Sequence, residues 1–158
     1  MTIHIRVAEP EDVEGIARVG ALAFTRDKDA LAQNLFPDHL LPAGVDEKFI
    51  SLPWRIPRKK WWQKADHAVM MVAVDDELDG QIVGFTLWEK PEEPGKTVPK
   101  EPLVTCPGFD VEQYKYLREA SEKGFDAVLG AEGHKNMWCE FGFELSLLWR
   151  DLANCNQI

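Results

Sequence analysis

Two apolar segments joined by a short polar turn constrain the fold of this chain most strongly. Residues 68–74 form an apolar run of strand length, and residues 81–88 form a second one. The acidic segment between them ends in Asp79-Gly80, a pair typical of tight turns between antiparallel strands. The two runs therefore predict an antiparallel hairpin within a sheet.

The N-terminal residues predict a further strand followed by a helix. Apolar and polar residues alternate over 3–7, as in a half-buried strand. Pro10 fits a first helical turn, and the acidic residues after it complement the positive end of a helix. One apolar face at helical spacing comprises Val13, Ile16, Ala17, Gly20, Ala23 and Phe24. We expect a strand over 3–7 and a helix over 10–24 that packs on the sheet.

Prolines break up the segment between residues 25 and 65. Each proline restricts its own backbone and that of the residue before it, so only short helices are expected there. One is predicted over 45–50 and another from Pro57 onward. Five positive charges within 55–64 are interleaved with Trp54, Trp61 and Trp62, a pattern that fits either phosphate binding or a helix with buried indoles and solvated lysines.

The C-terminal half contains a loop, a helix and a strand-like tail. Residues 89–107 hold five of the ten prolines, which predicts a loop or tether. Asp110 is a candidate helix cap, and Gly124 is the expected stop after Lys123. A second short helical stretch is predicted up to Gly130. Residues 137–152 are rich in Trp, Phe and Leu and predict one long or two short strands.

Composition and charge narrow the functional classes. The chain has 158 residues, a length that fits one domain over 1–158. Its net charge of −9 predicts that it repels nucleic acid and anionic membranes. No signal region and no apolar run of roughly 20 residues is present, so we expect a cytoplasmic protein without a membrane partner. The three cysteines and four histidines lack zinc-binding or disulfide spacing, so no metal is expected.

Several of these residues resemble sequence motifs of a known protein family. Arg6 lies in the first strand, Ala23-Phe24 ends the first helix, and residues 83–88 read Val-Gly-Phe-Thr-Leu-Trp. This set resembles the N-terminal half of the GNAT superfamily of acyl-CoA-dependent N-acyltransferases, in a fungal-type subgroup. Residues 134–140 resemble the start of the next family strand, and residues 141–144, Phe-Gly-Phe-Glu, resemble a motif near the end of the family domain.

The resemblance implies a fold and a reaction. The implied fold is α+β, an α/β sandwich with a mainly antiparallel central sheet flanked by helices and an incomplete C-terminal half. It includes a proline-rich loop over 89–109 and an inserted helical segment over 110–130. The implied reaction is acetyl transfer from acetyl-CoA to a small-molecule amine. By resemblance, Glu140 is the candidate base and Phe24 and Trp88 are candidate substrate-binding residues.

One family motif is missing. The superfamily holds the coenzyme pyrophosphate on a Gln/Arg-x-x-Gly-x-Gly/Ala loop at a helix start, and no segment of this chain fits it. We therefore expect weak or absent acetyl-CoA binding and acetyl transfer. The alternatives are a non-catalytic GNAT-like module that binds a small molecule or dimerises, and a truncated gene product. A deletion, a mis-spliced gene model or selection for another role would each explain the junction between Glu140 and Phe141.

The tail carries a prediction of its own. Its apolar residues are Trp138, Phe141, Phe143, Leu145, Leu147 and Trp149. A single exposed strand cannot leave this much apolar surface in water, and an open strand edge invites pairing. We expect the tail either to close the sheet internally or to form a homodimer.

Overall fold

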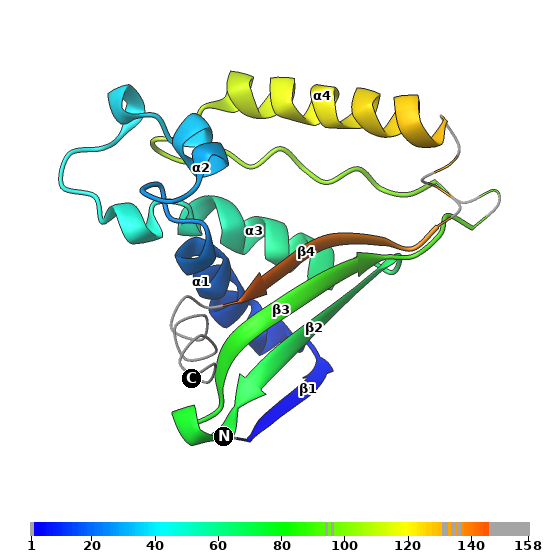
Figure 1. Ribbon diagram of the computed structural model, residues 1–158, viewed down its shortest axis with the longest axis horizontal. Coiled ribbons are helices and arrows are strands. Elements are labelled where there is room, and N and C mark those ends of the chain that lie inside the picture. The colour runs from blue at the N-terminus through cyan, green and yellow to red at the C-terminus, as the bar shows by residue number, and fades with distance from the viewer. Residues whose placement is uncertain are drawn as a thin grey trace, which may run out of the picture.

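The computed structural model describes residues 2–93, 95, 97–130, 133, 135 and 137–145, with the backbone alone for 140–145. It has a four-stranded sheet in the order β1-β2-β3-β4, in which every neighbouring pair is antiparallel (Figure 1). The strands are β1 (Ile3–Val7), β2 (Ala68–Asp75), β3 (Gln81–Glu89) and β4 (Cys139–Leu145). The α-helices are α1 (Val13–Ala23), α2 (Ala30–Leu35), α3 (Leu52–Gln63) and α4 (Val111–Leu129). The expected α+β class with an antiparallel sheet is confirmed.

The β2–β3 hairpin is confirmed, and its turn explains the Asp-Gly pair. A 3-10 turn over Asp76–Leu78 follows β2, and the Asp75 carboxylate accepts a hydrogen bond from the Glu77 amide at 3.0 Å. Asp79 then adopts a left-handed conformation with φ of 54°, and Gly80 follows with φ of 75°. Aspartate and glycine tolerate this region better than other residues, so the pair closes the turn.

One core joins the sheet to α1 and α3. Helix α1 packs against β3, β4 and α3, while α3 packs against β2. The buried members of this core are Ala8, Ile16, Val19, Met70, Val72, Val74, Phe85 and Leu87. Alternate residues of β2 and β3 enter this core, as the period of two predicts. The expected helix over 10–24 is present as a 3-10 turn over Pro10–Asp12 followed by α1.

Strand β1 presents its apolar side to solvent, which differs from the expected half-buried strand. The side chains of Ile5 and Val7 are 69% and 60% exposed. Arg6 donates two hydrogen bonds to the Asp12 carboxylate, at 2.5 and 2.8 Å, and Ala8 lies in the core. Because Arg6 and Ala8 occupy the side that meets α1, Ile5 and Val7, which alternate with them along the chain, point away.

Helix α3 begins at Leu52, so the predicted start at Pro57 is wrong and this proline lies inside the helix. The expected helix over 45–50 is a shorter 3-10 turn over Glu47–Phe49. Trp54 of α3 belongs to a second core, in which its ring lies 5.4 Å from Phe109. Packing of this indole outweighs the proline penalty, since tertiary context overrides local propensity.

The second core also anchors α4. Its buried members are Leu35, Phe36, Ile50, Trp54, Phe109 and Tyr114. Asp110 caps α4 as predicted, because its carboxylate accepts a hydrogen bond from the Gln113 amide at 2.9 Å. The helix continues through Gly124 to Leu129, so the expected stop at Gly124 is wrong. A helical glycine costs about 1 kcal/mol relative to alanine, which weakens a helix without ending it.

The described residues between Glu89 and Asp110 form neither helix nor strand, as the prolines predicted. Glu101 fixes this loop to α3. Its carboxylate accepts hydrogen bonds from Arg58 Nε at 2.5 Å, Arg58 Nη2 at 2.9 Å and Trp62 Nε1 at 3.1 Å. The loop is therefore held near its middle by a charged contact to a helix 43 residues earlier in the chain.

The expected tail strand is present as β4, which extends the sheet beyond β3 as far as Leu145. The remaining tail residues of that prediction, Leu147 and Trp149, lie outside the described residues. Trp138, just before the strand, is 53% exposed. Within the described part of the chain, no helix has the length and apolar character needed to cross a membrane.

Candidate functional site

A β-bulge lies beside Glu140, the predicted catalytic residue. Leu87 of β3 pairs with Gly142 of β4, whereas the next residue, Trp88, pairs with Glu140. Phe141 is thus the extra residue of the bulge. Bulges are over-represented beside active sites, because they redirect a strand locally. The fold therefore brings two predicted site residues, Trp88 and Glu140, to directly opposite positions on neighbouring strands.

The third predicted site residue lies elsewhere. Phe24 caps the C-terminal end of α1, and its ring centre is 5.7 Å from the guanidinium carbon of Arg55 on α3. This contact ties the end of α1 to α3 through a cation–π interaction. Among the described contacts, none joins Phe24 to Trp88 or Glu140.

Next to the bulge, the structure gathers titratable residues that sequence spacing did not reveal. Glu89 is opposite Cys139 across the β3–β4 pair, and its Oε1 atom lies 3.9 Å from His67 Nε2. This nitrogen is buried and has no hydrogen-bond partner among the described residues. The imidazole lies against the rings of Trp61 and Trp62, at 5.9 and 5.7 Å. Imidazole is the most common general base in enzymes, so His67 is a second candidate base.

Cys139 does not supply a nucleophile at this place. Burial, and then the negative charge of Glu89, raise the pKa of the Cys139 thiol above its ordinary value. A raised pKa keeps the thiol protonated at neutral pH, and the thiolate is the reactive form. Neither Cys106 nor Cys139 forms a disulfide with another described residue, and Cys155 lies outside the described residues. Covalent catalysis through Cys139 is therefore disfavoured.

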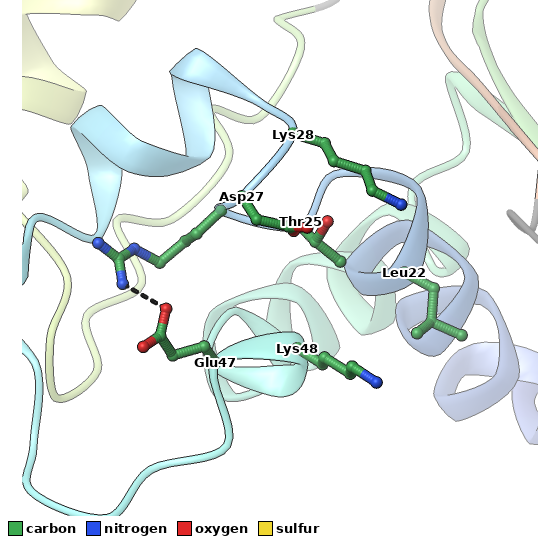
Figure 2. Close-up of a pocket in the computed structure, with 7 residues that line it drawn as sticks. Leu22, Thr25, Asp27, Lys28, Glu47 and Lys48 are labelled. Atoms are coloured by element: carbon green, nitrogen blue, oxygen red, sulfur yellow. Dashed lines mark hydrogen bonds and ion pairs between the residues drawn. The ribbon is translucent and has the colours of Figure 1, made fainter.

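A cavity of about 310 Å³ lies at the end of α1 (Figure 2). Its lining residues are Leu22, Thr25, Arg26, Asp27, Lys28, Glu47 and Lys48. Arg26 is only 9% exposed, and its guanidinium donates to Glu47 at 2.7 Å and to Asp38. The Nε atom of the same side chain is buried without a hydrogen-bond partner in the described part of the chain.

The cavity carries both signs of charge. The Thr25 hydroxyl, with smaller contributions from Lys28 and Lys48, holds the pKa of Asp27 below its ordinary value. Asp27 is therefore ionised at neutral pH. In Figure 2, Lys28 and Lys48 extend on the Leu22 side of the cavity, opposite Glu47. Such a surface suits a small zwitterion, whose ammonium group would face Asp27 and whose carboxylate would face Lys28 and Lys48.

The basic residues of α3 serve the fold. Arg58 pairs with Glu101 and stacks 4.1 Å from the Trp54 ring centre. Arg55 donates to the Ser51 hydroxyl at 3.1 Å, and the Lys59 ammonium lies 4.0 Å from the Phe85 ring centre. These contacts support the interpretation of 55–64 as a packed helix over that of a phosphate-binding patch.

The two tyrosines of α4 have separate environments. Tyr114 is buried in the second core, and Tyr116 is 66% exposed. Neither contacts the bulge in the described structure, which agrees with their interpretation as packing and surface residues. Among the described residues, no three of the His, Cys, Asp and Glu side chains are grouped to hold a metal ion.

Comparison with protein-family models and with curated proteins finds no match to this chain. The resemblance to the GNAT superfamily therefore stays a prediction from the quoted residues.

Proposed function

We propose that this chain is a degenerate GNAT-like module whose transfer of acetyl groups from acetyl-CoA to amines is weak or absent. One observation carries the assignment: the order and pairing of β1, α1, the β2–β3 hairpin and β4. This order follows the family motifs quoted above, and Glu140 lies opposite Trp88 at a bulge. The strand arrangement thus supports the relationship, and the missing loop argues against full activity.

The physical reason for weak activity is the coenzyme pyrophosphate. It needs several oriented backbone N–H donors at a helix start, and scattered cations do not reproduce that geometry. Three clustered cations of α3 already contact other groups of the protein. They are Arg55, Arg58 and Lys59. We therefore expect no micromolar binding of acetyl-CoA.

Calorimetry with acetyl-CoA, together with a thiol-release assay over a panel of small amines, tests this proposal. The expected result is no saturable heat at micromolar coenzyme and release no faster than without protein. Micromolar binding would overturn it. In that case Arg58→Gln should be compared with Lys115→Gln, because Lys115 is a cation on α4 and lies outside the 55–64 cluster. If transfer is observed, Glu140→Gln and His67→Gln would show which base takes the ammonium proton.

The charged cavity favours a second candidate function, which is binding of a small zwitterion such as an amino acid, without chemistry. Here Asp27 would pair with the ammonium group, Lys28 and Lys48 would pair with the carboxylate, and Leu22 would contact the apolar part. Thermal unfolding with millimolar amines, carboxylates and amino acids is the test. A rise in midpoint that is specific to amino acids and is lost in Asp27→Asn supports binding. A rise that persists in Asp27→Asn contradicts it, and Glu112→Gln on α4 is the matched control.

The third possibility, a truncated gene product, is tested by the transcript sequence across Glu140 and Phe141. A recovered segment encoding a Gln/Arg-x-x-Gly-x-Gly/Ala loop would establish it. An uninterrupted transcript would show that the shortened chain is the one expressed.

A further inference from the structure

A second cavity borders the one at the end of α1. Its volume is about 450 Å³, and its lining residues are Arg26, Asp27, Gln33, Pro37, Asp38 and Glu47. Three of these, Arg26, Asp27 and Glu47, also line the first cavity. A molecule bound in the first cavity therefore has a neighbouring space into which a longer side chain can extend.

The two cavities differ in the charges that line them. Lys28 and Lys48 line the first cavity but not the second. The first has three cations and two carboxylates, which leaves a formal excess of one positive charge. The second has one guanidinium and the carboxylates of Asp27, Asp38 and Glu47, which leaves a formal excess of two negative charges. The pair of cavities thus has a basic end and an acidic end.

The acidic end is built around a buried guanidinium. Arg26 is only 9% exposed, and its backbone carbonyl accepts a hydrogen bond from the Gln33 side-chain amide at 2.7 Å. Its guanidinium donates to one oxygen of Asp38 and to one oxygen of Glu47, and these two carboxylates are 92% and 62% exposed. Within the described part of the chain, no hydrogen bond uses the second oxygen of either carboxylate. Two charged acceptors are therefore held in place and remain open to a cation.

Arg26 itself is not saturated by its two acidic partners. It lines both cavities, and its buried Nε–H group has no hydrogen-bond partner among the described residues. A buried donor without an acceptor is unfavourable, so an acceptor supplied by a bound molecule would stabilise the site. This observation favours a ligand that carries acceptors as well as positive charge over a simple amine, whose ammonium groups only donate.

We propose that the two cavities together bind a basic amino acid, such as lysine or ornithine, whose side-chain cation lies between Asp38 and Glu47. The proposal rests on the amino-acid binding described above as the second candidate function, in which Asp27 pairs with the α-ammonium group. Lys28 and Lys48 then pair with the carboxylate at the basic end. The side-chain cation reaches the open carboxylate oxygens at the acidic end, where the side chain of an acidic amino acid would be repelled.

Calorimetry on the full chain with lysine, norleucine and cadaverine tests the proposal. Norleucine keeps the amino-acid groups of lysine but lacks its side-chain cation, and cadaverine lacks the carboxylate. We expect lysine to bind roughly ten-fold more tightly than norleucine, the order expected for one hydrogen bond to a charged group. Equal affinities for lysine and norleucine would overturn the proposal and leave the binding of amino acids intact, as would cadaverine that binds as tightly as lysine. Absence of binding by all three would overturn both.

Substitutions separate the contributions of the two cavities. Asp38→Asn should reduce the preference for lysine over norleucine several-fold and leave the affinity for norleucine unchanged, because its amide oxygen still accepts from Arg26. Asp27→Asn should weaken both ligands together. Glu112→Gln is the matched control, since its side chain is 83% exposed on α4 and lines neither cavity.

Circular dichroism shows whether each variant keeps the fold, and Glu47→Gln provides the same comparison if Asp38→Asn does not. An unchanged preference for lysine in the folded variant of the acidic end would contradict the proposal. So would a preference that falls equally in Glu112→Gln, because the effect would then come from net charge and not from the cavity.

Discussion

Removing the carboxylate of Glu101 should release the proline-rich loop from α3 and destabilise the fold. Glu101→Ala deletes the acceptor of three hydrogen bonds, two from Arg58 and one from Trp62. The Glu101 side chain is 7% exposed and that of Arg58 is 24% exposed, so the remaining guanidinium loses its partner in a partly buried place.

The size of the effect follows from this burial. Breaking a buried ion pair by removing one partner costs about 3–5 kcal/mol, and water reaching the partly exposed Arg58 favours the lower end. We therefore expect a loss of about 3 kcal/mol in the free energy of unfolding. For a chain of this length that lowers the thermal midpoint by roughly 6–12 °C. Glu101→Gln should fall between the wild type and Glu101→Ala, because its amide oxygen still accepts from Trp62.

Urea unfolding followed by circular dichroism measures the difference, with thermal unfolding as a second readout. The control is Glu112→Ala, which removes an exposed carboxylate 2.8 Å from Lys115 on α4. Exposed pairs of this kind contribute less than about 1 kcal/mol. If Glu101→Ala were no more destabilising than Glu112→Ala, the loop would not be held by this contact, and our account of it would be wrong.

Three further predictions concern other parts of the fold. The Arg6 hydrogen bond holds the pKa of Asp12 below its ordinary value. The Asp12 carboxylate therefore stabilises the fold at neutral pH, and this stabilisation is lost as the pH falls through the folded-state pKa of Asp12. Asp12→Asn should therefore lower stability at pH 7 and flatten the acid side of the stability profile, and parallel urea titrations that show an unchanged slope would contradict this. Gly124→Ala should raise the free energy of unfolding of the monomer by about 0.5–1 kcal/mol, because the helix gains propensity and the new methyl group meets open space; a drop in the midpoint would count against it. Replacing Phe143 and Leu145 with Lys should destabilise the fold or dissociate a dimer, since both residues pair with β3, and unchanged stability and mass would show that the tail does neither.

Local signals in the sequence were sufficient for the elements that depend on local chemistry. The Asp79-Gly80 turn and the Asp110 cap each depend on residues within a few positions, and both were predicted. The β2–β3 hairpin follows in the same way from two apolar runs and one turn. These interactions need no knowledge of distant parts of the chain.

Contacts between distant residues account for the remaining differences. The alternation in β1 was recognised, but which side is buried depends on where α1 packs, and this left Ile5 and Val7 outside. Trp54 packing keeps α3 helical through Pro57. His67 was missed as a candidate site residue for the same reason. It lies beside Glu89, which is 22 positions later in the sequence. A register shift at one bulge brought Glu140 opposite Trp88, and no sequence spacing shows such a shift.

The contact at Glu101 also changes how the long connection between β3 and α4 behaves as a polymer. An anchor near the middle converts one flexible span into two shorter ones, and the entropy of closing each depends only on its own length. Residues 102–108 link Glu101 to the buried Phe109, so added residues there must bulge between two fixed points. Residues 97–100 precede the anchor and are mostly exposed. Insertions such as an epitope or a protease site should therefore be tolerated before Glu101 far better than after it.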